Sequence, residues 1–186
     1  MDKSIFIPKR KSYMNIGDIF FWTATINNWY RLLENDLYKD IIISSLDYLS
    51  DRNKVDVFAF IIMPNHVHFI WRSKDMNGKE TMQGSFLKYT AHEFRKLLLK
   101  TNPAQLNLYK VDAINKQHEF WQRDSLAIHL FTREVAYQKL DYLHNNPLAE
   151  RWQLVNHPCK YKYSSAGFYE ENKIDFPFIK DLRNEF

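Results

Sequence analysis

The feature that most constrains the fold of this sequence is a pair of short apolar runs near its middle. Residues 55–63 and 66–72 are rich in β-branched and aromatic side chains, and this composition favours β-strands. Pro64 and Asn65 separate the two runs and are typical turn residues. The sequence therefore predicts an antiparallel hairpin at this point of the chain.

Helical patterns flank the predicted hairpin on both sides. Apolar residues recur at helical spacing in 35–53, and Asn35 or Asp36 is the expected N-cap of this helix. A second amphipathic pattern covers 82–100. We therefore expect one helix before the hairpin and one after it.

Two further strands and a third helix complete the order of elements. Alternation in 18–28 predicts the first strand, and 119–131 is the expected last strand. Thr132 is the expected N-cap of the third helix, with Glu134 in its first turn and Pro147 at its end. The order β-α-β-β-α-β plus a helix predicts an α+β, ferredoxin-like fold with split β-α-β units. In this fold a central antiparallel sheet carries helices on one face, and here an additional C-terminal segment.

Length and composition indicate one globular domain. A chain of 186 residues is long enough for a full hydrophobic core, so we expect 1–186 to be a single domain. We expect 101–117 to be a variable loop or an irregular insertion and 150–186 to wrap the body, with 167–186 as a peripheral tail. The sequence has neither an apolar run of about eighteen residues nor a signal-peptide pattern, so we expect no membrane span. The single cysteine, Cys159, fits a reducing cytoplasm, where we expect the protein.

Basic residues gather in two places. The net charge of +4 permits a polyanionic partner without requiring one. A cluster within 1–15 either grips DNA as a basic arm or is simply a free terminus. Basic residues on the predicted helix 82–100 either contact phosphates or form a solvated face. The candidate DNA-binding residues are Lys9, Arg10, Lys11, Lys88, Arg95 and Lys96.

Two histidines lie one residue apart in the second strand of the predicted hairpin. Side chains at i and i+2 of a strand share a face about 6.5 Å apart, so His66 and His68 should project together, away from Val67. Two neutral imidazoles on a rigid strand make half of a divalent metal site. Alternatively, both are buried histidines that hydrogen-bond to neighbours. Ile70 excludes a histidine-triad hydrolase, and the lack of a glutamate before Glu80 excludes a cupin site.

The third predicted helix carries candidates for the rest of such a site. Tyr142 and Asn146 are four residues apart and therefore stack on one helix face. An asparagine carbonyl oxygen suits Mg²⁺ or Mn²⁺, and a neighbouring cation favours the phenolate of a tyrosine, whose ordinary pKa is about 10. Alternatively, Tyr142 packs in the core and Asn146 only ends the helix. Tyr89, with His92 at i+3, is a rival nucleophile but brings no adjacent oxygen ligand.

Three motifs in a fixed order resemble one enzyme family. The segments "IMPNHVHFIW", "FWQRDSLAIHL" and "KLDYLHNNPLAERW" are similar to those of HUH-type single-tyrosine (Y1) transposases. They look most like the REP-associated branch of the IS200-like group, and the likeness covers most of the chain. It implies that His66 and His68 bind a metal together with Asn146. It also implies that Tyr142 is the nucleophile.

The resemblance also implies a reaction. Members of the family cleave single-stranded DNA next to short hairpins with a divalent metal, Mg or Mn. The tyrosine retains the 5′ phosphate as an ester, the other product is a free 3′ hydroxyl, and no nucleotide cofactor is needed. Asn146, where minimal IS200 elements have glutamine, follows the REP-associated pattern, whereas loop 101–117 does not match strongly. Some members exchange the tyrosine helix between subunits, so both a monomer and a homodimer remain open.

Two other functions fit the same residues. A catalytically idle, domesticated copy binds hairpin DNA without cutting it, although the complete set of site residues argues against decay. A metal-dependent hydrolase of small phosphodiesters uses water as the attacking group and needs no tyrosine. A covalent protein–DNA adduct distinguishes the transferase from both alternatives.

Overall fold

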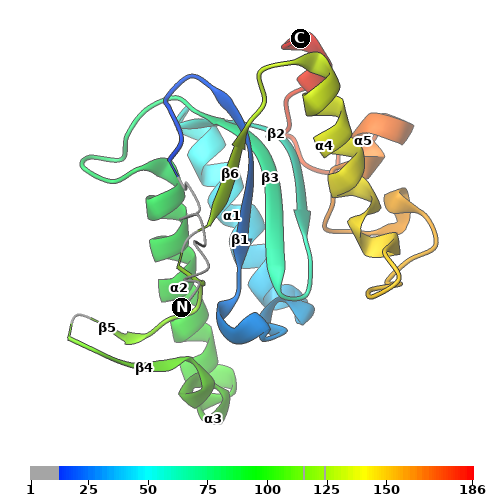
Figure 1. Ribbon diagram of the computed structural model, residues 1–186. Coiled ribbons are helices and arrows are strands. Elements are labelled where there is room, and N and C mark those ends of the chain that lie inside the picture. The colour runs from blue at the N-terminus through cyan, green and yellow to red at the C-terminus, as the bar shows by residue number, and fades with distance from the viewer. Residues whose placement is uncertain (1–12, 115, 124) are drawn as a thin grey trace, which may run out of the picture.

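A central antiparallel sheet organises the molecule. The structure is a computed model that describes residues 13–114, 116–123 and 125–186, so the basic cluster at Lys9, Arg10 and Lys11 lies outside the described residues. Four strands pair in the order β2-β3-β1-β6, each antiparallel to its neighbour (Figure 1). These strands are β1 (Ile19–Thr25), β2 (Val55–Ile62), β3 (His66–Ser73) and β6 (Leu126–His129).

The strand order confirms the predicted fold class. Helices connect β1 to β2 and β3 to β6, and the hairpin β2–β3 lies between them, as in the ferredoxin-like arrangement. The turn of the hairpin is closed by the Met63 N–H, which donates to the His66 carbonyl over 2.8 Å. The predicted hairpin at Pro64 and Asn65 is therefore present.

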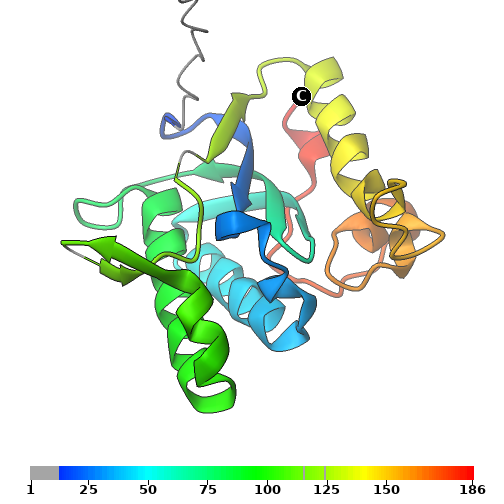
Figure 2. The ribbon, with the colours of Figure 1, turned by 60° about the horizontal axis from the view of Figure 1, so that its bottom comes forward.

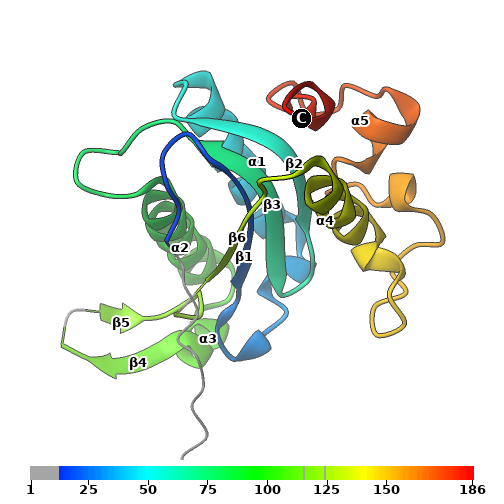
Figure 3. The same cartoon turned by 45° about the horizontal axis from the view of Figure 1, so that its top comes forward.

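Helices cover both faces of this sheet. The helices α1 (Asp36–Asp51) and α2 (Met82–Thr101) lie on one face, as expected (Figure 1). The helices α4 (Arg133–Asn145) and α5 (Ala166–Glu171) lie on the other side, beyond the hairpin β2–β3 (Figure 3). Among the helices of the described ranges, none combines the length with the apolar character that crossing a membrane requires.

The alternation of each strand divides the core in two. Trp22 of β1 and Trp71 of β3 pack against Phe86 of α2 in the larger cluster. The neighbouring residues Phe21 and Ile70 point the other way, into a second cluster that contains Leu140 and Leu143 of α4. A strand places successive side chains on opposite faces, so this division follows directly from the sequence pattern.

Side-chain caps fix where the helices begin. The Asn35 side chain accepts from the Leu37 N–H over 3.0 Å at the start of α1. The Thr81 and Thr132 hydroxyls cap α2 and α4 in the same way. These caps satisfy amide groups that have no partner within a helix, which explains why the predicted starts agree with the structure.

The stretch 101–117 forms an ordered insertion and not a variable loop. This stretch forms the short helix α3 (Pro103–Leu106) and the strand β4 (Lys110–Ala113), which pairs with β5 (Lys116–His118). The resulting arm extends from the end of α2 (Figure 2). Leu106 and Tyr109 are buried at its base, so tertiary packing orders a segment whose polar sequence shows little periodicity.

The last strand is much shorter than predicted. Only Leu126–His129 of the expected 119–131 pairs with β1. Phe120 and Trp121 are buried instead, and the Trp121 indole N–H donates to the Thr90 hydroxyl of α2 over 3.0 Å. Apolar residues of this stretch are therefore used for packing on a helix and not for extending the sheet.

The C-terminal region wraps around the edge of the sheet. Within 167–186, expected to be a peripheral tail, Leu182 is fully buried and Ile179 forms a parallel bridge with Val57 of β2. The Tyr169 hydroxyl donates to the Phe58 carbonyl over 2.7 Å. Short 3-10 turns make up much of the remaining chain: η1 (Asn27–Trp29), η2 (Leu32–Glu34), η3 (Asn107–Tyr109), η4 (Asn146–Leu148), η5 (Pro158–Lys160) and η6 (Leu182–Asn184).

Candidate active site

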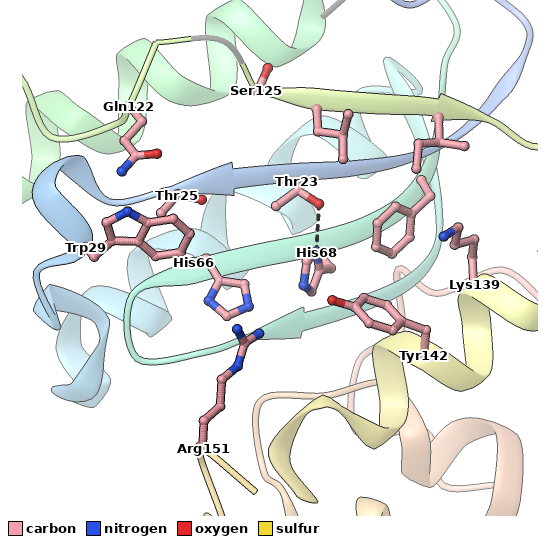
Figure 4. Close-up of a pocket in the computed structure, with 13 residues that line it drawn as sticks. Thr23, Thr25, Trp29, His66, His68, Gln122, Ser125, Lys139, Tyr142 and Arg151 are labelled. Carbon is pink, nitrogen blue, oxygen red and sulfur yellow. Dashed lines mark hydrogen bonds between the residues drawn. The ribbon is translucent and has the colours of Figure 1, made fainter. Parts of the chain in front are cut away.

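The two histidines of β3 and the tyrosine of α4 face one cavity of about 300 Å³. The imidazole rings of His66 and His68 lie 4.7 Å apart between centroids, and the His68 and Tyr142 rings lie 5.5 Å apart. The Tyr142 hydroxyl points from α4 toward His68 (Figure 4). Elements far apart in the sequence thus bring two metal-type ligands and a candidate nucleophile together.

The sheet holds both imidazoles rigidly. His66 and His68 are 4% and 5% exposed. The alternate residues Val67 and Phe69 are fully buried in the larger cluster, on the other face of the sheet. His68 also stacks on Phe21 of β1, with ring centroids 5.1 Å apart. Packing on both faces therefore fixes the direction in which the imidazoles point.

Each histidine has a hydrogen-bond partner on its Nδ1 nitrogen. Nδ1 of His66 lies 2.7 Å from Asn65 Oδ1, and Nδ1 of His68 lies 2.7 Å from the Thr23 hydroxyl of β1. When Nδ1–H donates in these bonds, the lone pair of Nε2 is free. A metal-binding histidine needs this tautomer, and such partners typically orient it.

Burial and nearby cations keep both rings uncharged at neutral pH. Burial, followed by the charge of Arg151, lowers the pKa of His66 to about 4, and the neighbouring amide of Asn146 only partly opposes this. Burial also holds the pKa of His68 well below its ordinary value, with further lowering by His66, Arg151 and Lys139. Neutral imidazole is the form that binds metals.

Asn146 follows α4 and lies beside His66, not on the wall of the cavity. It is buried, and its Oδ1 has no hydrogen-bond partner among the described residues. Nε2 of His68 is likewise buried and has no partner within the described part of the chain. An unpaired buried acceptor costs about 1–3 kcal/mol, and a bound cation satisfies such lone pairs. Two imidazole nitrogens and an amide oxygen therefore form a donor set that fits a divalent metal ion.

Tyr142 is 48% exposed, so part of its side chain is open to solvent where it lines the cavity. Its ring packs edge-on against Phe21, with centroids 5.9 Å apart. The ammonium of Lys139, one turn earlier on α4, lies 5.7 Å from the ring centroid. The phenol is thus fixed at its base by aromatic packing and has a cation beside it.

Three residues at this cavity were missed by the sequence analysis. Lys139, Arg151 and Trp29 all line it, from α4, from the loop after η4 and from the turn after β1 (Figure 4). The i−3 spacing of Lys139 from Tyr142 was a usable signal. Trp29 and Arg151 reach the cavity only through the tertiary fold, and nothing in their local sequence indicates it.

The other candidates lie away from this cavity. Tyr89 is half-exposed on α2, which packs on the opposite face of the sheet. Lys88 and Lys96 form ion pairs with Glu80 and Glu93 over 2.6 and 2.7 Å. Arg95 lines a separate cavity with His92 and His118. None of these side chains is brought together with the histidine pair.

The C-terminal region holds a second group of ligand-type side chains. His157, Cys159 and Glu170 place their ligand atoms within 4.8 Å of one another, although no spacing pattern in the sequence groups them. The Cys159 thiol donates to Glu170 over 3.2 Å, and burial together with this carboxylate raises the pKa of the thiol to about 11. The thiol is therefore protonated at neutral pH and acts here as a hydrogen-bond donor.

Comparison with known proteins identifies the fold. No protein-family model matches the sequence, and no curated protein does. A solved structure of a REP-associated tyrosine transposase bound to a REP hairpin is similar, with a TM-score of 0.58 and 16% sequence identity. The match covers 86% of this chain and 83% of that one. The chain therefore has the fold of a REP-associated tyrosine transposase.

Proposed function

We propose that this protein is a metal-dependent single-stranded DNA endonuclease and strand transferase. It cleaves near DNA hairpins and forms a covalent 5′-phosphotyrosine intermediate. The observation that carries the proposal is the placement of Tyr142 at 5.5 Å from the His68 ring, on one cavity that both residues line. The shared fold with a tyrosine transposase supports the same reaction class.

His66, His68 and Asn146 are the proposed ligands of the metal, Mg²⁺ or Mn²⁺. When bound, the ion supplies Lewis-acid polarisation of a phosphodiester oxygen and lowers the cost of the phenolate. Thr23 and Asn65 hold the two imidazoles in the required tautomer through their Nδ1 contacts. The neutral state of both rings, which burial enforces, keeps the ligand lone pairs available at pH 7.

Tyr142 is the proposed nucleophile. Its Oη forms a bond to the phosphorus while the bond from phosphorus to the 3′ oxygen breaks. The phenolic proton passes to water at the exposed side of the ring, and the departing 3′ oxygen takes up a proton to become a free hydroxyl. Reversing these steps joins a 3′ hydroxyl to the phosphate held on the tyrosine.

The proposed partner is a single strand that carries a hairpin. The similar structure is of a transposase bound to a REP hairpin, and this chain has exposed or half-buried cations at the cavity, Lys139 and Arg151. Such cations position a phosphate backbone without reading its sequence. Since Tyr142 and the histidines of one chain meet, we propose that one subunit cuts in cis, whether alone or in a homodimer.

A denaturing gel tests this proposal. The protein is incubated with end-labelled single-stranded hairpin DNA in Mn²⁺, with and without EDTA. Wild-type protein and Tyr89→Phe should give a denaturation-resistant adduct that EDTA prevents, and Tyr142→Phe should give none. An adduct with Tyr142→Phe would refute the proposal. Cleavage without any adduct would indicate a hydrolase that uses water, and binding without cleavage would indicate an idle DNA-binding protein.

A further inference from the structure

An exposed tryptophan stands at one end of the cavity, on a strained turn. Trp29 is 59% exposed, although indole is usually at least partly covered. Asn28 and Trp29 both adopt left-handed backbone conformations, with φ of 54° and 57°. Two consecutive non-glycine residues in this region are unfavourable, and such strain persists only where the surrounding structure imposes it.

One amide joins this turn to the histidine pair. Asn65 Nδ2 donates to the Trp29 carbonyl over 3.3 Å, and Asn65 Oδ1 accepts from Nδ1–H of His66 at 2.7 Å. Asn65 itself is buried. The backbone of the turn that carries the indole and the ring of His66 are therefore hydrogen-bonded to the same side chain.

The cavity wall between Trp29 and Tyr142 combines two kinds of surface. The indole supplies a flat apolar face beside His66, and the Arg151 guanidinium lies close to the same imidazole (Figure 4). Lys139 places a second cation at the far end, next to Tyr142. An aromatic platform next to cations that neutralise a backbone is the combination that binds unpaired nucleotides, because every base has a face that can stack.

We infer that the Trp29 indole stacks on an unpaired base adjacent to the phosphate that lies over the histidine pair, and that Asn65 is the positioning residue for this contact. The inference rests on the proposed function, since it assumes a DNA strand in the cavity. It adds a specific base contact at one end of the site. It also gives a reason for displaying an indole on a strained backbone, where burial would otherwise be favourable.

Binding measured without metal tests the inference separately from cleavage. The probe is a fluorescent DNA hairpin with an unpaired flank of ten thymidines, titrated in EDTA and followed by anisotropy. Trp29→Ala should weaken binding by roughly fivefold to a hundredfold, the range expected for the loss of one stacked base. Trp29→Phe should retain most of the affinity. The matched control is Tyr48→Ala, which removes an aromatic side chain that is 61% exposed on α1, and it should change affinity by less than about twofold.

Abasic probes locate the stacked base. At one position of the flank, an abasic site should lower the affinity of the wild-type protein but not that of Trp29→Ala. At the other positions, an abasic site should change the affinity of both proteins equally. Asn65→Ala should reduce the Trp29-dependent part of the affinity and lower the yield of adduct in Mn²⁺. Thermal melting checks that each variant is folded.

The outcomes separate this inference from the proposed function. Wild-type affinity and adduct yield in Trp29→Ala overturn the stacking contact and leave the transferase intact. If wild-type protein forms no adduct, but the abasic site weakens its binding and not that of Trp29→Ala, the proposed transferase activity is overturned and the stacking contact stands. No binding of the probe by wild-type protein, or equal effects of Trp29→Ala and Tyr48→Ala, overturns the inference.

Discussion

The two faces of the central sheet are built from the same strands but differ in what they bury. Toward α1 and α2, β1 and β3 present aromatic and aliphatic side chains, and the Trp22 and Trp71 rings lie 5.2 Å apart. Toward the cavity the same strands present Thr23, His66 and His68. One face thus stabilises the fold, and the rigidity it gives the strands holds the imidazoles of the other face in place.

The largest expected effect lies on the cavity face and concerns activity. Tyr142→Phe and His68→Ala should each lower adduct formation at least about a thousandfold, because nucleophile and ligand act as one unit. For Tyr142→Phe, the free energy of unfolding should stay within about 0.5 kcal/mol of wild type, since the ring is half-exposed. Adduct kinetics and urea unfolding measure the two quantities. If Tyr142→Phe loses stability together with activity, the conclusion that the two faces of the sheet serve different purposes is contradicted.

On the opposite face the effect should be on stability. Trp71→Ala removes a fully buried ring and should lower the free energy of unfolding by about 3–5 kcal/mol. Where the variant remains folded, adduct formation per folded molecule should change little. The result to watch for is a loss below about 1 kcal/mol in urea unfolding, which would mean that this cluster does not support the sheet.

A set of ion pairs joins the hairpin β2–β3 to the C-terminal chain. Asp56 of β2 lies 2.7 Å from an Arg72 nitrogen and 2.6 Å from Lys180. Burial alone would raise the pKa of Asp56, but the hydrogen bonds from Lys180 and Arg72 outweigh it and lower the pKa overall. Asp56→Asn should therefore cost about 2 kcal/mol at pH 7.

The pH dependence of this cost has a definite sign. Because the folded-state pKa of Asp56 is depressed, its contribution is present above about pH 4 and is lost as the pH falls through the folded value. Unfolding curves of wild type and Asp56→Asn should converge in acid. The exposed Asp47→Asn serves as the control and should follow wild type at every pH. A constant gap between wild type and Asp56→Asn would show that the charge is not what matters.

The smallest expected effect sharpens the comparison within one strand. Thr23→Val removes the hydroxyl that contacts His68 Nδ1 and should raise the Mn²⁺ concentration needed for half-maximal adduct formation roughly tenfold. Thr25→Val, two residues along the same face, is the matched control because Asn65, not Thr25, contacts His66 Nδ1. Equal metal dependence of the two variants would remove Thr23 from the site.

Sequence patterns predicted those parts of the fold that depend on local interactions. The N-cap at Asn35 and the strand alternation around His66 are local, and the structure contains both. The β4–β5 arm and the packing of Leu182 depend on contacts with distant residues, so no periodicity revealed them. For the same reason, the polar sequence of 101–117 does not predict the helix and strands that it forms.

The candidate site shows the same limit. The i, i+2 spacing predicted that His66 and His68 share a face, and their rings do lie side by side. The family resemblance alone implied that Tyr142 lies next to them. The position of α4 on the sheet depends on packing with residues far away in the sequence, which local patterns do not predict. Trp29 and Arg151 were not foreseen because each reaches the cavity from a turn or loop whose path the sequence does not encode locally.

The partial exposure of Tyr142 bears on the second half of the proposed reaction. A DNA end attached to a fully enclosed phenol could be approached by another strand only after the helix had moved aside. In the proposed reaction, the exposed part of Tyr142 leaves room beside an attached DNA end, while the buried imidazoles of His66 and His68 stay in place. An incoming 3′ hydroxyl can thus take the position that the departing one has vacated, and cutting and joining can share a single geometry.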